Sequence, residues 1–137
     1  MQLKGSCLCG AVGYRAATPV RRIVNCHCGL CRKMNGSAFS SYAVIPFEAL
    51  EISGEAYVAK YAVTERAKKH YCSRCGTPLF NLNSKYPGAC MLYLGAVDGA
   101  EQYAPSLNVY CESMLSWLDG VVSLEGFPAG PERRASD

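Results

Sequence analysis

The feature of this sequence that most restricts its fold is the close spacing of its cysteines. Seven of the nine cysteines occur in three tight clusters. These clusters are an N-terminal pair (Cys7, Cys9), a cysteine triple (Cys26, Cys28, Cys31) and a C-terminal pair (Cys72, Cys75). Residues i and i+2 of an extended segment point to the same side, so a Cys-x-Cys step presents two sulfur atoms to one point. The chain therefore has to fold around points where sulfur atoms converge.

This spacing favours metal binding over disulfide bonds. A bond between Cys7 and Cys9 would close a very small, strained ring, because disulfide geometry is demanding. The segment Cys72-Ser73-Arg74-Cys75-Gly76 is typical of a metal-binding turn, in which Gly76 permits a left-handed backbone. The odd number of cysteines also leaves one thiol over in a full disulfide scheme. We predict metal sites, with a disulfide framework and a redox-active Cys-x-x-Cys pair as the alternatives.

Length and composition indicate one soluble domain. A chain of 137 residues fits one domain, and its 50% hydrophobic content supplies a core without disulfides. The polar opening Met1–Ser6 lacks the apolar run of a signal peptide. No apolar stretch approaches the roughly 18 residues that cross a membrane. We therefore expect a cytoplasmic protein without a membrane partner, and in that compartment paired cysteines bind metal more often than they form disulfides.

Counting ligands divides the seven cysteines into four and three. A closed zinc site takes four ligands, whereas a catalytic zinc site typically has three protein ligands and one open position. If the cysteine triple keeps its own ion, the two pairs must share the other ion. That closure orders a loop of about 60 residues, so metal binding there contributes most to folding. We expect this first site to be structural.

The cysteine triple allows two interpretations. With an open position, its zinc would be a weak Lewis acid because three thiolates donate charge to it, and capture of an incoming thiol suits it better than zinc-hydroxide hydrolysis. In a second structural site, a fourth ligand would come from His27, Cys90 or Cys111. We expect other roles for these residues: core packing for the two cysteines, and a polar surface position for the histidine.

Other polar residues near the clusters allow more than one role. His70 alternates with Cys72 along a strand and could face the first ion, although four sulfur atoms suffice there. Arg32 and Lys33 follow the cysteine triple directly. They could offset its negative charge, bind an anionic substrate, or form a solvated surface pair.

Charge argues against a nucleic-acid partner. The formal charge is +3 with all thiols counted as neutral. One zinc with four thiolates lowers this by two, and a second zinc with three thiolates lowers it by one, so the loaded protein is near neutral. The basic residues also form no long run that would indicate a nucleic-acid patch.

The remaining pattern is one of short strands separated by Gly, Pro and Asn turns. The predicted strands are residues 10–14, 22–25, 38–45, 51–52, 56–61, 69–72, 78–82, 90–94 and 107–110. One helical turn is expected at Leu30–Met34, and no segment longer than ten residues has helical periodicity. Residues 128–137 are rich in Pro, Gly and charge, which predicts a disordered C-terminal tail. We predict a mainly β, zinc-stapled single domain of short antiparallel strands over residues 1–127.

The order of the motifs resembles the glutathione-dependent formaldehyde-activating enzyme (GFA) family, whose domain is similar to one in centromere protein V. The motifs are Cys-x-Cys-Gly, Cys-His-Cys-x-x-Cys-Arg-Lys and Cys-x-x-Cys-Gly-Thr-Pro-Leu. Gly36-Ser37-Ala38-Phe39 and the closing segment Trp117–Pro128 add to the likeness. The resemblance extends from about Gly5 to Pro128, which is most of the chain.

The resemblance implies a β-tent-like fold with two Zn²⁺ per chain. It places Cys7, Cys9, Cys72 and Cys75 on a structural zinc, and Cys26, Cys28 and Cys31 on a catalytic zinc whose fourth position takes water or the glutathione sulfur. The implied reaction joins glutathione to formaldehyde as S-hydroxymethylglutathione, a carbon–sulfur lyase reaction in reverse. One departure is visible: Asn108 stands where many family members have histidine.

Two classes of function follow from the sequence. The first is a zinc-dependent carbon–sulfur lyase acting on a thiol–aldehyde adduct, with glutathione and a small aldehyde as partners. The second is a non-catalytic zinc-binding module for a protein or nucleic-acid partner. Because a fold does not dictate a substrate, relatives with the same domain can act on other thiols or electrophiles.

Overall fold

The computed structural model describes residues 2–131, and it is mainly β, as predicted. The described residues form ten strands in two sheets. The smaller sheet is antiparallel with the order β1-β2-β5. Its strands are β1 (Leu3–Ser6), β2 (Gly13–Ala16) and β5 (Leu50–Ser53).

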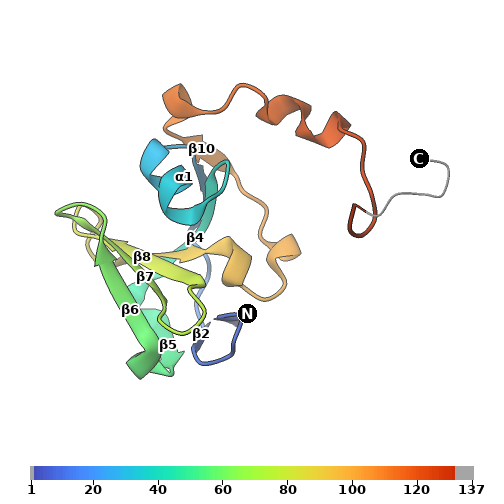
Figure 1. Cartoon of the computed structure of the whole chain (residues 1–137). Coiled ribbons are helices and arrows are strands. Elements are labelled where there is room, and N and C mark those ends of the chain that lie inside the picture. Colours follow the sequence, from blue (N-terminus) through green and yellow to red (C-terminus); the bar gives the residue numbers. More distant parts are fainter. Residues whose placement is uncertain (1, 132–137) are drawn as a thin grey trace.

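The larger sheet has seven strands in the order β10-β3-β4-β9-β8-β7-β6 (Figure 1). Its neighbours pair antiparallel except β10 and β3, which are parallel. The strands are β3 (Arg22–Cys26), β4 (Ser40–Pro46), β6 (Val58–Ala62), β7 (Ala67–Cys72), β8 (Pro78–Asn83), β9 (Ala89–Tyr93) and β10 (Leu107–Val109).

Helical segments in the described residues are short. The α-helix α1 covers Gly29–Asn35, which includes the helical turn predicted from the sequence. Gly36 ends it in the left-handed conformation (φ 62°), where a residue without a Cβ is favoured. The 3₁₀ helices are Phe47–Ala49, Glu55–Tyr57, Leu94–Ala96, Ala100–Gln102, Cys111–Ser113 and Leu118–Ser123.

The larger sheet is buried on both faces near its centre. Side chains alternate between the faces of a strand. On β4, Ala43 and Ile45 belong to the main core with residues of the smaller sheet, whereas Tyr42 belongs to a separate cluster with Cys26 and Tyr93. The main core therefore lies on one face of the larger sheet. The cysteine triple lies on the other face.

The strand predictions agree with the structure in type, and the differences have local causes. β1 has no predicted counterpart, because its sequence Leu3-Lys4-Gly5-Ser6 is short and half polar. The strand expected from Ala56 begins at Val58, since Glu55–Tyr57 forms a 3₁₀ turn that starts at Gly54 with φ 78°. β5 lies in the smaller sheet, an arrangement that depends on its pairing with β2 and not on its own sequence.

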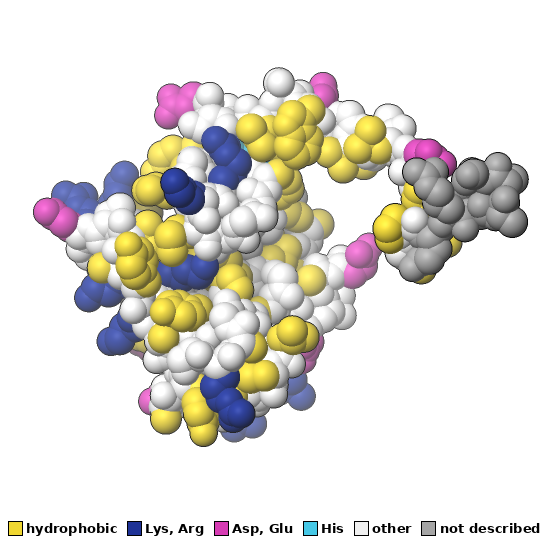
Figure 2. Space-filling model, viewed as in Figure 1, with side chains coloured by type: hydrophobic (Ala, Val, Ile, Leu, Met, Phe, Trp, Pro, Cys, Tyr) yellow, Lys and Arg dark blue, Asp and Glu magenta, His cyan; other side chains and the backbone are white. Residues whose placement is uncertain are grey.

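After β10 the chain runs along the outside of the molecule, and we call residues 111–131 the C-terminal segment (Figure 1). Figure 2 shows hydrophobic side chains along it, and Trp117 is 58% exposed and Val122 93% exposed. The predicted tail, residues 128–137, overlaps the end of this segment, and its residues 132–137 lie outside the described residues. The domain boundary at residue 127 stays a prediction. Among the described residues, no helix is long and apolar enough to cross a membrane.

Candidate metal centres

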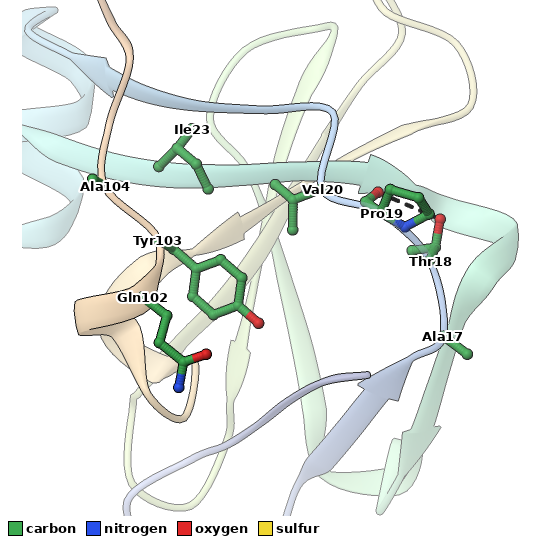
Figure 3. Close-up of a pocket in the computed structure, with 8 residues that line it drawn as sticks. All are labelled: Ala17, Thr18, Pro19, Val20, Ile23, Gln102, Tyr103 and Ala104. Atoms are coloured by element: carbon green, nitrogen blue, oxygen red, sulfur yellow. Dashed lines mark hydrogen bonds between the residues drawn. The ribbon is translucent and has the colours of Figure 1, made fainter. Parts of the chain in front are cut away.

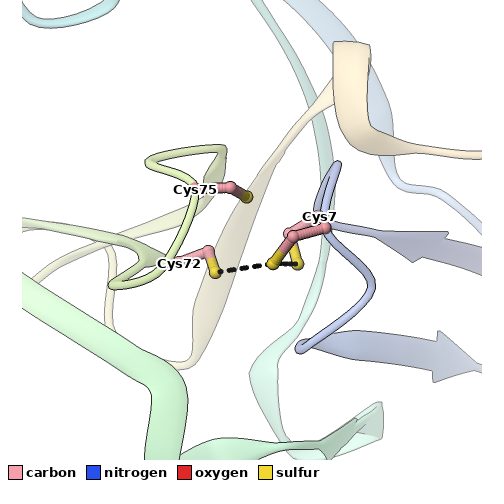
Figure 4. A group of neighbouring side chains, drawn as sticks. Cys7, Cys72 and Cys75 are labelled. Atoms are coloured by element: carbon pink, nitrogen blue, oxygen red, sulfur yellow. Dashed lines mark hydrogen bonds between the residues drawn. The ribbon is translucent and has the colours of Figure 1, made fainter.

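The structure brings the two cysteine pairs together in one group, which we call the four-cysteine group (Cys7, Cys9, Cys72, Cys75). The four Sγ atoms lie within 4.8 Å of one another. Figure 4 shows Cys7, Cys72 and Cys75 pointing toward one another from two separate turns. The Sγ of Cys9 lies 3.6 Å from that of Cys7 and 3.8 Å from that of Cys72. Because one turn follows β1 and the other joins β7 to β8, this group links the two sheets.

Both turns depend on a glycine. Gly10 has φ 80° and Gly76 has φ 78°, values that side chains with a Cβ rarely adopt. The N–H of Gly10 donates to the carbonyl of Cys7 (3.2 Å), and the N–H of Gly76 donates to the carbonyl of Cys72 (2.8 Å). Each turn thereby aims two thiols the same way. Gly29 also follows a cysteine, but it differs from Gly10 and Gly76 because it begins a helix and its φ is not positive.

Polar hydrogens surround the sulfur atoms of the four-cysteine group. The backbone N–H of Val12 donates to the Sγ of Cys7 (3.2 Å), and that of Arg74 donates to the Sγ of Cys72 (3.4 Å). The Thr77 hydroxyl lies 3.2 Å from the Sγ of Cys75, and this contact, together with the backbone N–H groups of Thr77 and Cys9, lowers the pKa of that thiol to about 5. Such donors stabilise thiolates, the form of cysteine that binds metal.

The cysteine triple forms a second group, at the end of β3 and the start of α1. Its three Sγ atoms also lie within 4.8 Å of one another. The thiol of Cys31 donates to the Sγ of Cys26 (3.4 Å), a bond that lowers the pKa of Cys26 and raises the pKa of Cys31. Cys28 has a further role as the N-cap of α1, because its Sγ accepts the backbone N–H of Cys31 (3.3 Å). The three thiols come from six consecutive residues, so they converge without bringing distant segments of the chain together.

Two basic side chains hold α1 in place. Lys69 of β7 is buried, and its ammonium donates to the carbonyl of Met34 (2.6 Å) and to Oδ1 of Asn35 (3.0 Å) at the end of the helix. Burial lowers the pKa of Lys69. Arg32 donates to two backbone carbonyls at 2.7 Å, those of His27 and Ser113.

These contacts exclude one of the roles considered for Arg32. Arg32 ties α1 to the C-terminal segment through backbone carbonyls and is half-buried, so it is not a solvated surface residue. Lys33 is exposed. The contact of the buried Lys69 with the end of α1 was not predicted from the sequence.

Tyr42, Asn81 and Tyr93 lie beside the cysteine triple, although no sequence motif predicted them as site residues. The Tyr42 hydroxyl is 3.2 Å from the Sγ of Cys31, and Nδ2 of Asn81 donates to the same hydroxyl (3.3 Å). Tyr93 donates to Oδ1 of Asn81 (2.7 Å). Burial raises the pKa of both tyrosines. The available signal was Asn81 itself, a polar residue inside the apolar run Pro78–Leu82.

The surface position predicted for His27 is wrong, because its side chain is only 2% exposed. Its ring packs against Phe39, with centroids 5.0 Å apart, and its Nε2 lies 2.9 Å from Oδ1 of Asn108. Oδ1 of Asn108 also accepts from Asn25 (3.3 Å). The parallel pairing of β10 with β3 places Asn108 beside Asn25. The departure noted at residue 108 therefore supplies an acceptor for a buried histidine near the cysteine triple.

The other candidate ligands lie elsewhere. Cys90 is fully buried in the main core, as predicted. Cys111 is exposed, so the prediction of a packing role for it is wrong. Its thiol instead donates to the carbonyl of Asn108 (3.7 Å). His70 stacks on Phe80 with ring centroids 4.3 Å apart, and it is not part of the four-cysteine group.

The spacing of the sulfur atoms fits a tetrahedral metal ion. Metal–sulfur bonds of about 2.3 Å give a tetrahedron whose edges are about 3.8 Å. The Sγ···Sγ distances of 3.6 and 3.8 Å in the four-cysteine group and 3.4 Å in the cysteine triple are close to that edge. Both groups could each hold one ion. Their all-sulfur donor sets suit zinc or other thiophilic ions and not magnesium or calcium.

An open hollow in the described residues lies apart from both groups. It has a volume of about 570 Å³ and is lined by the loop Ala17–Val20, by Ile23 and by Gln102–Ala104 (Figure 3). Ile23 belongs to the main core, on the face of the larger sheet opposite the cysteine triple. No cysteine lines the hollow, so the sulfur groups remain the stronger candidates for a functional centre.

Comparison with known proteins gives a consistent result. A family model described as glutathione-dependent formaldehyde-activating enzyme matches residues 2–113. A Halomonas elongata protein named "Putative glutathione-dependent formaldehyde-activating enzyme" is 28% identical over 129 residues, which cover 87% of this chain and 81% of that protein. An uncharacterised lyase of Schizosaccharomyces pombe is 30% identical over 79 residues, 58% of this chain and 56% of that protein.

A crystal structure of a Rhodobacter sphaeroides protein has a similar fold. The TM-score is 0.61 at 20% sequence identity, and the match covers 76% of this chain and 98% of that one. At this identity the likeness concerns the fold alone. The family match spans both cysteine groups and ends at residue 113, within the first three residues of the C-terminal segment. The chain therefore belongs to the glutathione-dependent formaldehyde-activating enzyme family.

Proposed function

We propose that this protein is a zinc-dependent carbon–sulfur lyase that makes and breaks a thiol–aldehyde adduct such as S-hydroxymethylglutathione. The observation that carries the proposal is the ligand count of the cysteine triple. Three Sγ atoms converge there, and no His, Cys, Asp or Glu of residues 2–131 joins them as a fourth ligand. A tetrahedral ion held by three protein ligands keeps one position for a substrate. Family membership supports the same choice.

The two groups receive different roles in this proposal. Cys7, Cys9, Cys72 and Cys75 hold a structural zinc, because four thiolates complete its shell. Cys26, Cys28 and Cys31 hold a catalytic zinc, giving two Zn²⁺ per chain. When bound there, the zinc supplies a positive charge that lowers the pKa of an incoming thiol, so the thiol binds as a thiolate nucleophile.

The residues around the cysteine triple shape the place where the thiol arrives. Tyr42 and Tyr93 are buried against it, with Met91 and Val109 partly buried alongside. This lining removes water from one side of the sulfur atoms, and electrostatic interactions are stronger where water is excluded. The substrate-facing side is the exposed one, because Cys28 and Cys31 are only partly buried.

The cytoplasm is the compartment we propose for this chemistry. The nine cysteines are all free in the structure. Thiol groups persist in a reducing compartment, which also supplies low-molecular-weight thiols such as glutathione.

Exchange spectroscopy by NMR tests the proposed reaction. Glutathione and formaldehyde form their adduct without a catalyst, and we expect the zinc-loaded protein to accelerate the interconversion above that background rate. Cys28→Ala should abolish the acceleration, whereas Cys111→Ala, which removes an exposed cysteine outside both groups, should retain it. An unchanged exchange rate at all protein concentrations, with two zinc ions bound, contradicts this substrate and favours a non-catalytic zinc module.

A further inference from the structure

A directed chain of hydrogen bonds ends on one sulfur atom of the cysteine triple. It runs from Tyr93 through Asn81 and Tyr42 to Cys31, with donor–acceptor distances of 2.7, 3.3 and 3.2 Å. Both tyrosines are nearly buried, at 7% and 5% exposed, and their rings pack with centroids 4.9 Å apart. These hydrogen bonds lie on the face of the larger sheet that carries α1.

The direction of each bond follows from the proton inventory. Tyr93 has one hydroxyl proton, and it points at Oδ1 of Asn81. This fixes the amide, so its Nδ2 must face Tyr42 and donate to the phenol oxygen. The single proton of Tyr42 is then left for the Sγ of Cys31.

The Sγ of Cys31 can accept a hydrogen bond from Tyr42 both without and with a metal ion in the cysteine triple. Without metal, the thiol proton of Cys31 is directed to the Sγ of Cys26 (3.4 Å), so Cys31 can only accept from Tyr42. With a metal bound, all three cysteines are thiolates and carry no proton. Cys28 instead accepts a backbone N–H, which no side-chain substitution removes.

We propose that Tyr42 is a positioning residue that donates a hydrogen bond to the Cys31 thiolate and thereby sets how strongly this ligand donates charge to the bound metal. The inference rests on the proposed metal role of the cysteine triple. Hydrogen bonds from neighbouring groups orient metal ligands and tune the metal, and their loss typically costs about 10–100-fold in metal affinity or activity. Withdrawing charge from one of three thiolates makes the ion a better acceptor for the sulfur of an incoming thiol.

Packing alone does not account for this arrangement. Phenylalanine would fill nearly the same volume as Tyr42 or Tyr93 without placing a hydroxyl in a buried site, and leucine would remove the half-buried amide of Asn81. Burying a polar group costs free energy of folding unless the group is hydrogen-bonded. Tyr14 gives the contrast within this chain: it is 6% exposed, and its hydroxyl has no hydrogen-bond partner within residues 2–131.

Cobalt substitution provides the test. Protein loaded with cobalt at both groups shows sulfur-to-cobalt charge-transfer bands, and subtracting the spectrum of Cys28→Ala isolates the band of the cysteine triple. Tyr42→Phe should shift this band to longer wavelength, because a thiolate that loses a hydrogen bond gives up electrons more easily. The matched control Tyr14→Phe should leave the band in place. A Tyr42→Phe band that superimposes on that of the unmodified protein overturns the proposal.

A second variant and a second measurement keep the proposal testable even if Tyr42→Phe folds poorly. Tyr93→Phe frees the Asn81 amide but keeps the ring that packs on Tyr42, and it should shift the band in the same direction by a smaller amount. Zinc affinity measured by chelator competition should fall about tenfold in Tyr42→Phe. Unchanged affinity contradicts the proposal. These readouts require no activity, so they stand even if glutathione exchange is not accelerated. Absence of any cobalt band from the cysteine triple would instead refute the metal site.

Discussion

The four-cysteine group and the cysteine triple use the same ligand atom in opposite structural settings. The first joins turns of two different sheets, from Cys7 to Cys75, and its sulfur atoms are surrounded by backbone N–H groups and Thr77. The second is drawn from six consecutive residues on one face of one sheet, beside buried polar side chains. Both groups therefore offer sulfur ligands, but losing the metal has different consequences. The four-cysteine group joins the two sheets, so the fold depends on its metal. The cysteine triple is local to one segment, so the fold does not depend on its metal.

Loss of the four-cysteine group should have the largest effect. Structural zinc contributes about 10–16 kcal/mol in small zinc domains, which matches or exceeds the whole stability of a typical domain. We expect Cys75→Ala to lose cooperative unfolding and most soluble expression. Cys28→Ala should retain both, as measured by circular dichroism and urea titration. If the two variants are equally stable, the contrast between the groups is wrong.

Metal removal should occur in two steps. A chelator should take the ion of the cysteine triple first, because only three protein ligands hold it, against four at the other group. Circular dichroism should stay unchanged through this first step and change only in the second. A zinc-sensitive dye measures the release. Loss of both ions together with the fold would show that the two groups are not independent.

Lys69→Met should weaken the cysteine triple more than the four-cysteine group. The substitution leaves the carbonyl of Met34 without its charged donor, at a cost of about 2–3 kcal/mol in the free energy of unfolding. It also loosens the helix that carries Cys31. The exposed neighbour Lys68→Met serves as the control and should change stability little. Chelator competition should report weaker binding of one ion only.

Asn108→Ala should have the smallest effect. It removes the acceptor for Nε2 of the buried His27, at a cost of about 1 kcal/mol. Asn108→Asp keeps an acceptor oxygen and should retain most of the stability in urea titrations. A loss as large as that of Lys69→Met would mean that the β10–β3 contact supports the cysteine triple more strongly than its hydrogen bonds indicate.

The sequence predicted the parts of this molecule that depend on local spacing. Cys-x-Cys and Cys-x-x-Cys steps fix which sulfur atoms can meet, and Gly76 marks the left-handed turn that the structure contains. Alternating apolar residues predicted most strands, and the fully buried Cys90 behaves as a core residue.

What the sequence did not predict depends on contacts between distant segments. Lys69 reaches Met34 across the sheet, and Tyr42 meets Asn81 only because β9 lies between β4 and β8. His27 looked like a surface residue because its neighbours are ligands, but the parallel strand β10 covers it. No single segment encodes these pairings, since register and strand order decide them.

Zinc content per chain tests the central claim most directly. We predict two zinc ions in the unmodified protein and one in Cys28→Ala, with the circular dichroism spectrum of the variant unchanged. One zinc ion in the unmodified protein, or two in Cys28→Ala, would contradict the division of the seven cysteines into a structural and an open site.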